Sequence, residues 1–528
     1  MNSSFPQKNE IRNFIQTALI VVLLTFAALV VLQQANPARN KLGRDAGAYL
    51  YIGSRVLRGD APYLTAWDGK PPAIFLLDAF GIWLGRGTRW GVWLVEFISL
   101  SGAAFLGFIA MRRQFWVAAA LFSSLIWLYG LNNILIGGNL TEEYSLFFSF
   151  LSIYFFVLTL GRDASLRIYA GIGISAGISF LFRPNNTGTQ MGIILTMIII
   201  FLIEKQYAVL IKRLLVVGIS ALVPLGILSV YLGAKGALAA FWDATIVYNF
   251  SYAGAHHFNP IASFSAGILF FHIATGMILI GYLAAATEVV SQWASRSKIE
   301  PILLWIALTG LIETMLSGLS GRNYEHYFIN WIPFTALATA LLIFRTLPVL
   351  VAWAEKKTFI FLVTILVLFS VSFYEVPGRF YKNIAPLFFG RSARIQLFDP
   401  VVEYVNVNTT PEQTVFVWGG QAGINFLARR DSPVPYLFFP LGVPSRITDQ
   451  LSRDVYETFV AAPPTLVVDG SIYDDRYIVP ISVDDPVAWL SEHGVYNTPY
   501  LVEMIEFIRE NYALVRTVNQ VDIYRLNP

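Results

Sequence analysis

Residues 43–72 read GRDAGAYLYIGSRVLRGDAPYLTAWDGKPP, and this stretch follows the first apolar segment of the chain. It holds Asp45, Asp68 and Lys70 beside aromatic side chains, at the point where a membrane-spanning chain first meets water. Only 13% of all residues are charged, so a dense group of acids, bases and Tyr/Trp residues at a membrane boundary needs an explanation. The most economical explanation is a site that handles a lipid-linked substrate.

The composition is that of an integral membrane protein. The 528 residues are 56% hydrophobic and their mean hydropathy is +0.58, which exceeds the apolar share of an ordinary soluble domain. The chain contains no Cys, which excludes a disulfide framework and thiolate metal chemistry. The formal net charge of +3 is too small to argue for nucleic acid as a partner.

Apolar runs recur along most of the chain. A bilayer core of about 30 Å needs about 20 apolar residues per helix, and this length predicts about eleven transmembrane helices. The expected spans are 14–33, 90–111, 115–136, 144–160, 168–182, 187–203, 214–232, 264–289, 302–315, 327–343 and 359–373. No small-residue cleavage site follows the first run, so it is expected to be retained as a helix. The run 72–84 is too short to span and contains Asp78, which favours an interfacial helix.

The distribution of basic residues predicts the orientation. With a cytoplasmic N-terminus, every inner turn is basic, as the positive-inside rule requires. These inner residues are Arg112, Arg113, Arg162, Arg167, Lys205, Lys212, Arg213, Arg296, Lys298, Lys356 and Lys357. The protein is therefore expected to be a multi-pass protein of the cell inner or plasma membrane, with everything after residue 374 on the external or periplasmic side.

Two domains are expected. Residues 1–377 would form the transmembrane domain, with its first outer loop at 35–89, and residues 378–528 an external soluble α/β domain. In this second part, the pattern predicts strands at 414–418 and 465–469, helices near 424–429 and across 501–511, and a final strand pair.

The first outer loop resembles a known superfamily. The matching residues are Asp45 with Tyr49, then Gly59, Pro62 and Tyr63, then Trp67, Asp68, Lys70, Pro71 and Pro72. Residues 137–145, GGNLTEEYS, form a second acidic outer motif. Together with this motif, the residues of the first loop resemble the membrane glycosyltransferases of the GT-C superfamily. The likeness is to protein O-mannosyltransferases, lipid A aminoarabinose transferases and rhizobial galacturonosyltransferases, and covers roughly the first two-thirds of the chain.

The resemblance implies an enzyme that moves a sugar from a polyprenyl-phosphate donor to an acceptor hydroxyl on the outer face, where the acceptor is a lipid, a protein or a polysaccharide. It also implies that the acid of the first loop is the catalytic base and that Lys70 lies near the donor phosphate. Many relatives have adjacent Asp-Glu in the first motif, whereas Ala46 follows Asp45 here. The base is therefore either Asp45 alone or Asp45 assisted by Glu142 or Glu143.

General chemistry supports the same residues. A carboxylate that accepts the proton of a sugar hydroxyl contributes roughly 10²–10⁴-fold to the rate, and Asp45 is the first candidate. The alternative interpretation is that Asp45 is only the N-cap of a helix over 46–57.

The departing lipid phosphate requires cations. Lys70, Arg183, Arg322 and His326 stand at predicted outer helix ends, where they are candidates for binding the donor phosphate. Snorkelling at the membrane interface is the alternative for such residues.

Other candidates are weaker. Tyr49, Tyr63, Trp67 and Asp68 are candidates for binding the sugar, although aromatic belts at the interface produce a similar pattern. Glu142 and Glu143 with Asp45 would suit a divalent metal, or one of the two glutamates begins the next helix after Thr141. We expect no cofactor, because many relatives that use lipid-phosphate sugars work without a metal.

Two other classes of protein fit part of the pattern. A transporter of lipid-linked sugar would concentrate ionisable residues near the bilayer midplane. Apart from Glu96 and Glu313, the ionisable residues of this chain crowd the outer loops instead, and the sequence has no internal repeat. An outer-face polysaccharide polymerase or ligase would also have a large external loop, but it fits the KPP motif, Lys70-Pro71-Pro72, poorly.

Overall fold

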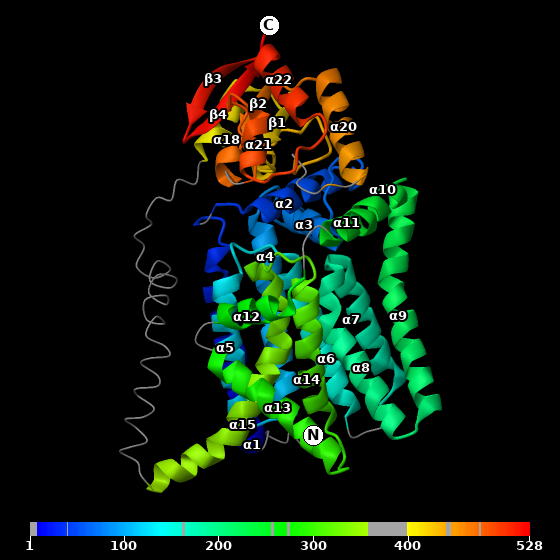
Figure 1. Cartoon of the computed structure of the whole chain (residues 1–528). Coiled ribbons are helices and arrows are strands. Elements are labelled where there is room, and N and C mark those ends of the chain that lie inside the picture. Colours follow the sequence, from blue (N-terminus) through cyan, green and yellow to red (C-terminus); the bar gives the residue numbers. More distant parts are fainter. Residues whose placement is uncertain are drawn as a thin grey trace, which may run out of the picture. The chain divides into compact units, whose positions relative to one another are not determined.

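The computed structural model of the chain describes residues 8–39, 41–160, 164–254, 258–271, 275–356, 399–439, 444, 446–474 and 477–528. The chain forms two compact units, which are described separately (Figure 1). The helical unit comprises Met1–Asn36, Val95–Leu225 and Asn259–Ala393. The mixed unit comprises Pro37–Leu94, Gly226–Phe258 and Arg394–Pro528. Residues 37–89, which make up most of the segment expected as the first outer loop, thus belong to the same unit as the C-terminal α/β segment, which we call the C-terminal module (residues 399–528).

The helical unit is built from long apolar helices. In chain order its elements are α1 (Lys8–Val31), η1 (Leu32–Gln34), α4 (Trp90–Arg112), α5 (Val117–Ile134), α6 (Thr141–Thr159), α7 (Leu166–Phe182), η2 (Pro184–Thr187), α8 (Gly188–Ile203), α9 (Tyr207–Ala234), α12 (Pro260–Phe270), α13 (Thr275–Ala294), α14 (Pro301–Gly318), η5 (Glu325–Trp331) and α15 (Ile332–Lys356). The first residues of α4, up to Leu94, and the last residues of α9, from Gly226, are counted with the mixed unit. Helix α6 packs on α7, α8 on α14, and α13 on α15 (Figure 1). Within the described residues, eight helices are long and apolar enough to cross a membrane.

Helix α9 shows how these helices are suited to lipid. Its apolar side chains point outward along its whole length, with Ile219, Leu222 and Ile227 exposed by 65%, 63% and 68%. A helix that leaves so many aliphatic side chains uncovered is stable where hydrocarbon takes the place of a protein neighbour.

The predicted fold class, a polytopic helical membrane protein with a C-terminal α/β part, is confirmed. The expected single span at 264–289 is wrong, because α12 ends at Phe270 and α13 begins at Thr275. The carbonyl of Ile268 at the end of α12 accepts from the Phe271 amide at 3.3 Å, and the hydroxyl of Thr275 donates a second hydrogen bond to it at 2.6 Å. The expected span at 359–373 lies outside the described residues.

The mixed unit combines short helices with a sheet. Its elements are α2 (Arg44–Leu57), α3 (Ala73–Leu84), α10 (Leu238–Trp242), the π-helical turn η3 (Asp243–Val247), α11 (Tyr248–Gly254), α18 (Pro400–Asn408), β1 (Val415–Trp418), α19 (Gly423–Ala428), α20 (Arg446–Ala461), β2 (Leu466–Asp469), η6 (Ser471–Asp474), α21 (Pro486–Glu492), α22 (Leu501–Asn511), β3 (Tyr512–Val518) and β4 (Val521–Leu526). The segment expected as a short interfacial helix is α3, whose 12 residues are too few to cross a bilayer.

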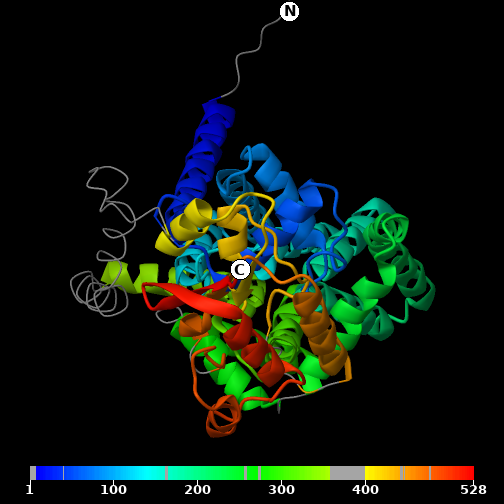
Figure 2. The same cartoon turned by 90° about the horizontal axis from the view of Figure 1, so that it is seen from above.

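The four strands form one sheet in the order β1-β2-β4-β3. Strands β1 and β2 are parallel, with Val415 opposite Leu466, whereas β4 pairs antiparallel with both β2 and β3. Helices α20 and α22 pack against each other in the same module (Figures 1 and 2). The two expected internal strands, the final strand pair and the helix at 501–511 are all present.

The central strands are buried on both faces. On one face Phe416, Trp418 and Val467 enter a core with the residues of α22, and on the other face Val415 and Val417 pack with α18 and α19. Strands covered on both faces read as continuous apolar runs, which is why VFVW and LVVD could be recognised in the sequence.

Helix α2 contacts the C-terminal module at close range through α19. A Cβ atom at Gly47 of α2 would lie 2.8 Å from the Cα of Gly423. The two backbones therefore approach to a distance that only glycine allows at this position. This contact joins α2 to the module.

Gly47→Ala should lower the stability of the mixed unit by about 1–3 kcal/mol, because the added methyl group overpacks a backbone contact. Gly226→Ala in α9 is the matched control, since a Cβ there meets no atom within 4 Å. Thermal unfolding of the two detergent-purified variants measures the difference. Equal unfolding midpoints for both variants and the parent would show that α2 and α19 do not approach this closely.

Candidate functional site

Asp45 lies in the first turn of α2, where its carboxylate is partly exposed. The helix is capped by Gly43, whose backbone is extended, and Asp45 is the second helical residue. The interpretation of Asp45 as the N-cap is therefore wrong. A carboxylate in the first turn is still favoured by the partial positive charge at the helix N-terminus.

Asp68 and Lys70 lie in the turn that follows α2. The carboxylate of Asp68 is 2% exposed, and its Oδ1 accepts a hydrogen bond from the Lys70 amide at 2.8 Å. Burial raises the pKa of Asp68, the charge of Lys70 opposes the rise, and the charge of Asp45 adds to it. The fold thus brings Asp45, Asp68 and Lys70 close enough to act on one another electrostatically.

Two other parts of the mixed unit hold this turn in place. The amide of Trp67 donates to the carbonyl of Pro435 in the C-terminal module at 2.7 Å. The Trp67 ring also meets that of Tyr248 edge-on, with centroids 4.9 Å apart, and the Asn249 side chain donates to the Gly69 carbonyl at 2.6 Å. The turn at residues 67–70, which we call the WDGK turn, therefore contacts both the module and α11.

The aromatic side chains of the loop are engaged within the protein. Tyr49 and Tyr63 are 2% and 4% exposed, and both rings pack on Phe75 of α3, with centroids 6.1 and 6.0 Å away. The Tyr63 hydroxyl donates to the Lys70 carbonyl at 2.8 Å. These rings support the backbone that carries Lys70.

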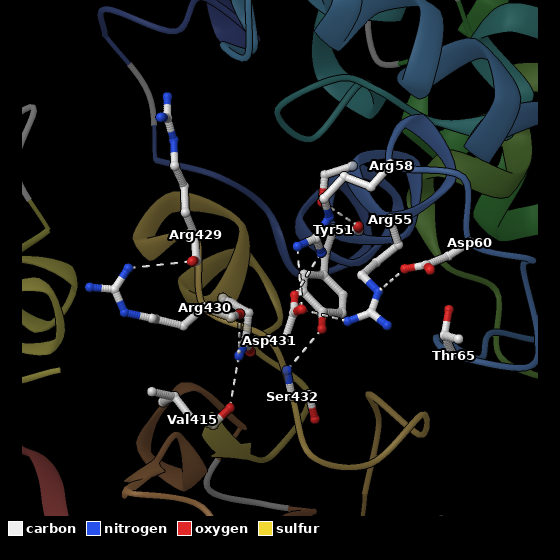
Figure 3. Close-up of polar contacts among 12 residues, drawn as sticks. Tyr51, Arg55, Arg58, Asp60, Thr65, Val415, Arg429, Arg430, Asp431 and Ser432 are labelled. Atoms are coloured by element: carbon white, nitrogen blue, oxygen red, sulfur yellow. Dashed lines mark hydrogen bonds and ion pairs between the residues drawn. The ribbon is translucent and has the colours of Figure 1, made fainter. Parts of the chain in front are cut away.

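A network of ion pairs, which we call the α2 clamp, joins α2 to the C-terminal module (Figure 3). Asp431 Oδ2 lies 2.9 Å from Arg55 Nη1, and Asp431 Oδ1 accepts from Arg58 Nη2 at 2.6 Å. Beside them, the amide of Ser432 donates to the Tyr51 hydroxyl at 2.9 Å.

The α2 clamp is anchored at both ends. The backbone carbonyl of Asp431 accepts from the Val415 amide of β1 at 2.9 Å, and Arg55 also pairs with Asp60 at 2.6 Å within the loop. Partial burial would raise the pKa of Asp431, but the hydrogen bond from Arg58 and the charge of Arg55 outweigh it and lower that pKa. The carboxylate therefore stays ionised in the clamp at neutral pH.

A second polar cluster lies in the helical unit. Glu142, in the first turn of α6, forms an ion pair with Arg183 at the end of α7. The Thr141 hydroxyl donates to the other Glu142 oxygen at 2.9 Å, and the Arg183 guanidinium lies 4.0 Å from the centroid of the Tyr327 ring. Each member of this ion pair thus has a partner of opposite charge inside the protein.

Asparagine side chains tie the segments of this cluster together. Asn186 Nδ2 donates to the Thr141 carbonyl at 3.1 Å and to Ser145 Oγ at 2.7 Å, while Asn330 Nδ2 donates to Asn186 Oδ1 at 2.9 Å. His326 acts electrostatically on Glu142. The motifs at 141–143, 183–186 and 322–330 therefore meet, with Arg322 partly buried in the last of them.

Glu143 occupies a different environment from Glu142. Its side chain is fully buried and its carboxyl lies against that of Glu96, whose Oε1 accepts from the Asn139 amide. The structure places Glu142 and Glu143 in the helical unit and Asp45 in the mixed unit. Within the described part of the chain, no group of three or more His, Asp or Glu residues is arranged to hold a metal ion.

The residues that complete these clusters lie far along the chain from their partners. Asp431 meets Arg58 across 373 positions, and Asn330 meets Asn186 across 144. No local pattern marks such partners. The one available signal was the charge of Asp431 next to Arg429 and Arg430, after an apolar strand and a short helix.

The chain matches no protein-family model and no curated protein sequence. Among solved structures it is similar to ArnT from Cupriavidus metallidurans bound to undecaprenyl phosphate, with a TM-score of 0.61 and 15% identity over 96% of this chain and 97% of that chain. The apo state of ArnT gives a TM-score of 0.57, with the same identity and coverage. The archaeal oligosaccharyltransferase AglB from Archaeoglobus fulgidus, in complex with an inhibitory peptide and a dolichol-phosphate, gives 0.53 at 13% identity, over 86% of this chain and 69% of that chain.

These neighbours define the class of fold. ArnT, a lipid A aminoarabinose transferase, and AglB are both GT-C glycosyltransferases. At 13–15% identity the likeness is one of fold, and it extends over nearly the whole of this chain and of ArnT. The protein has a GT-C fold, and the resemblance expected from the first outer loop is confirmed at that level.

Asp431→Asn should loosen α2, because it removes the charge that holds Arg55 and Arg58. Partly exposed ion pairs contribute up to about 1 kcal/mol, so we expect a loss of that size together with faster amide hydrogen exchange in α2. Asp60→Asn is the matched control, since Asp60 contacts Arg55 only from within the loop.

The parent and the Asp431→Asn variant also allow a test of pH dependence. Because the pKa of Asp431 is lowered in the fold, its contribution to stability is present above the unfolded pKa of about 4 and is lost as the pH falls through the folded value. The difference in stability between parent and Asp431→Asn should therefore shrink on acidification below about pH 4. If amide hydrogen exchange in α2 were the same in Asp431→Asn as in the parent at neutral pH, the α2 clamp would be contradicted.

Proposed function

We propose that the protein is a membrane glycosyltransferase that moves a sugar from a polyprenyl-phosphate donor to an acceptor hydroxyl on the outer face of the membrane. The observation that carries this proposal is the grouping of Asp45, Asp68 and Lys70 in one loop of a GT-C fold. Support also comes from the lipid phosphates that ArnT and AglB carry in their structures.

Asp45 is the proposed general base. Its carboxylate accepts the proton of the acceptor hydroxyl while the hydroxyl oxygen attacks the anomeric carbon of the donor. The bond from that carbon to the phosphate oxygen breaks, and the polyprenyl phosphate leaves with the electron pair. A single displacement of this kind inverts the anomeric configuration. Asp45 suits the role because its side chain is partly exposed, whereas Asp68 is buried.

Lys70 is the proposed partner of the departing phosphate. A cation positioned where negative charge develops stabilises the transition state. Arg183 is a weaker candidate for the same role, because Glu142 already neutralises it, and that pairing also makes Glu142 a weaker candidate for the base. Arg322 and His326 remain proposed phosphate ligands, and Glu143 remains a proposed substitute for Asp45.

The remaining parts of the proposal follow from the orientation. The N-terminus is proposed to be cytoplasmic and the C-terminal module external, so that the loop and the module meet the donor on the outer face. The acceptor is a lipid, a protein or a polysaccharide, and the reaction as written needs no metal ion. The contacts of Trp67 with Pro435 and of Arg55 with Asp431 assign the module a role in shaping the loop.

Asp45→Asn should lower turnover by roughly 10²–10⁴-fold, because the amide cannot accept the acceptor's proton. The fold should survive, since Gly43 rather than Asp45 caps α2. Asp485→Asn, at the cap of α21, is the matched control and should keep the parental rate. Donor affinity and transfer rate are measured on the same monodisperse protein. Transfer by Asp45→Asn at near the parental rate would rule out Asp45 as the base.

Lys70→Ala should weaken donor binding by roughly ten- to a hundredfold, which corresponds to the loss of a charged hydrogen bond of about 1.5–3 kcal/mol. Lys235→Ala removes the same charge from the same unit, where Lys235 donates to the Gly59 carbonyl, and should leave the affinity unchanged. Titration with a labelled polyprenyl-phosphate sugar measures both. Equal affinities in the two variants would assign Lys70 to snorkelling instead.

A further inference from the structure

A cavity of about 230 Å³ lies in the mixed unit, next to the start of α2. Three of its lining side chains, Arg39, Lys41 and Arg89, are cationic, and one, Asp399, is acidic. None of Asp45, Asp68 and Lys70 lines it. The cavity is therefore distinct from the proposed catalytic group.

The charge balance of the cavity favours an anion. Three cations and one carboxylate leave an excess of two positive charges. Asp399 is also committed elsewhere, because its Oδ1 caps α18 by accepting from the Val401 amide at 3.0 Å. Cationic side chains that converge on a small cavity suit a phosphate group, which offers several strong acceptor oxygens.

The chain itself places these cations at a membrane surface. Arg39 follows the candidate span Ile15–Gln34 by five residues, which limits its distance from the span to about 18 Å. Arg89 directly precedes the span Trp90–Arg112, and its Nη2 donates to the Pro37 carbonyl at 2.9 Å. One hydrogen bond thus joins the segment that follows one span to the residue that precedes the next.

The surroundings are those of a membrane interface. Trp83 and Trp90, on either side of Arg89 in the sequence, are 62% and 46% exposed, as in the aromatic belts of membrane proteins. Ile424 and Leu427 of α19 add an apolar wall to the cavity. A cavity that is lined by both cationic and apolar residues suits an amphiphile better than a free ion.

We propose that this cavity binds the phosphate group of an anionic membrane lipid. Arg39, Lys41 and Arg89 hold the phosphate oxygens, and Ile424 and Leu427 contact the glycerol and the first methylenes. Because α19 belongs to the C-terminal module and Arg39 to the first outer loop, a bound lipid links the module to the bilayer surface. This site is independent of the proposed glycosyl transfer, since its residues are not among those proposed for that reaction.

The test uses the full-length protein in a non-ionic detergent, with dioctanoyl phosphatidic acid as the probe and calorimetry as the measurement. The parent should bind the probe, and Arg39→Gln and Lys41→Gln should each weaken binding by roughly tenfold, as expected for the loss of one charge-assisted contact. The affinity should also fall as salt is raised. Thermal unfolding of each variant checks its fold, and Lys41 is exposed, so its replacement is not expected to disturb packing.

Three comparisons decide the outcome. Arg86→Gln, an exposed arginine that does not line the cavity, should bind the probe like the parent, and an equal loss there would overturn the proposal. Lys70→Ala should keep the affinity, and its loss would assign the lipid to the proposed donor site. Inorganic phosphate and dioctanoyl phosphatidylcholine should bind more weakly. Binding of inorganic phosphate as tight as that of phosphatidic acid would identify a free anion, and not a lipid, as the ligand.

Discussion

The contact of α2 with the C-terminal module is the constraint on which the proposed active site depends. Gly47 allows the backbone of α2 to approach Gly423 of α19, and a Cβ at this position would meet the Gly423 Cα at 2.8 Å. Asp45 lies only two residues before Gly47 in α2. Two to three turns beyond Gly47, Arg55 and Arg58 pair with Asp431. The position of the proposed base therefore depends on contacts between segments that are far apart in the chain.

Several modest interactions share the work of holding this loop. Each ion pair of the α2 clamp is partly exposed, so it contributes little by itself. Neighbouring hydrogen bonds add to the clamp. The Ser432 amide donates to the hydroxyl of the buried Tyr51, and the Trp67 amide donates to the Pro435 carbonyl. The WDGK turn and α2 thus contact the same segment of the module, around 431–436. Removal of one of these contacts should therefore displace the loop less than removal of the whole segment 431–436.

Sequence patterns predicted those features that local chemistry determines. Strands β1 and β2 were recognisable because both faces are buried and their residues are uniformly apolar, and the grouping of Asp45, Asp68 and Lys70 followed from their place in one loop. The break between α12 and α13 was missed, because the run at 264–289 is apolar enough to be taken for one span, and single polar residues such as His272 and Thr275 do not by themselves predict a break. The partners Asp431 and Asn330 were missed because their interactions form only after distant segments meet.

The fold accommodates a transferase and, on composition alone, a transporter of lipid-linked sugar, and the two differ in whether the bond between sugar and phosphate breaks. The most direct measurement is to offer the purified protein, reconstituted in vesicles together with a membrane extract that supplies acceptor hydroxyls, a panel of polyprenyl-phosphate sugars labelled in the sugar. We expect that at least one donor loses its labelled sugar to an acceptor and releases an equal amount of polyprenyl phosphate. Movement of the intact labelled lipid across the bilayer, without cleavage of any donor, would contradict it.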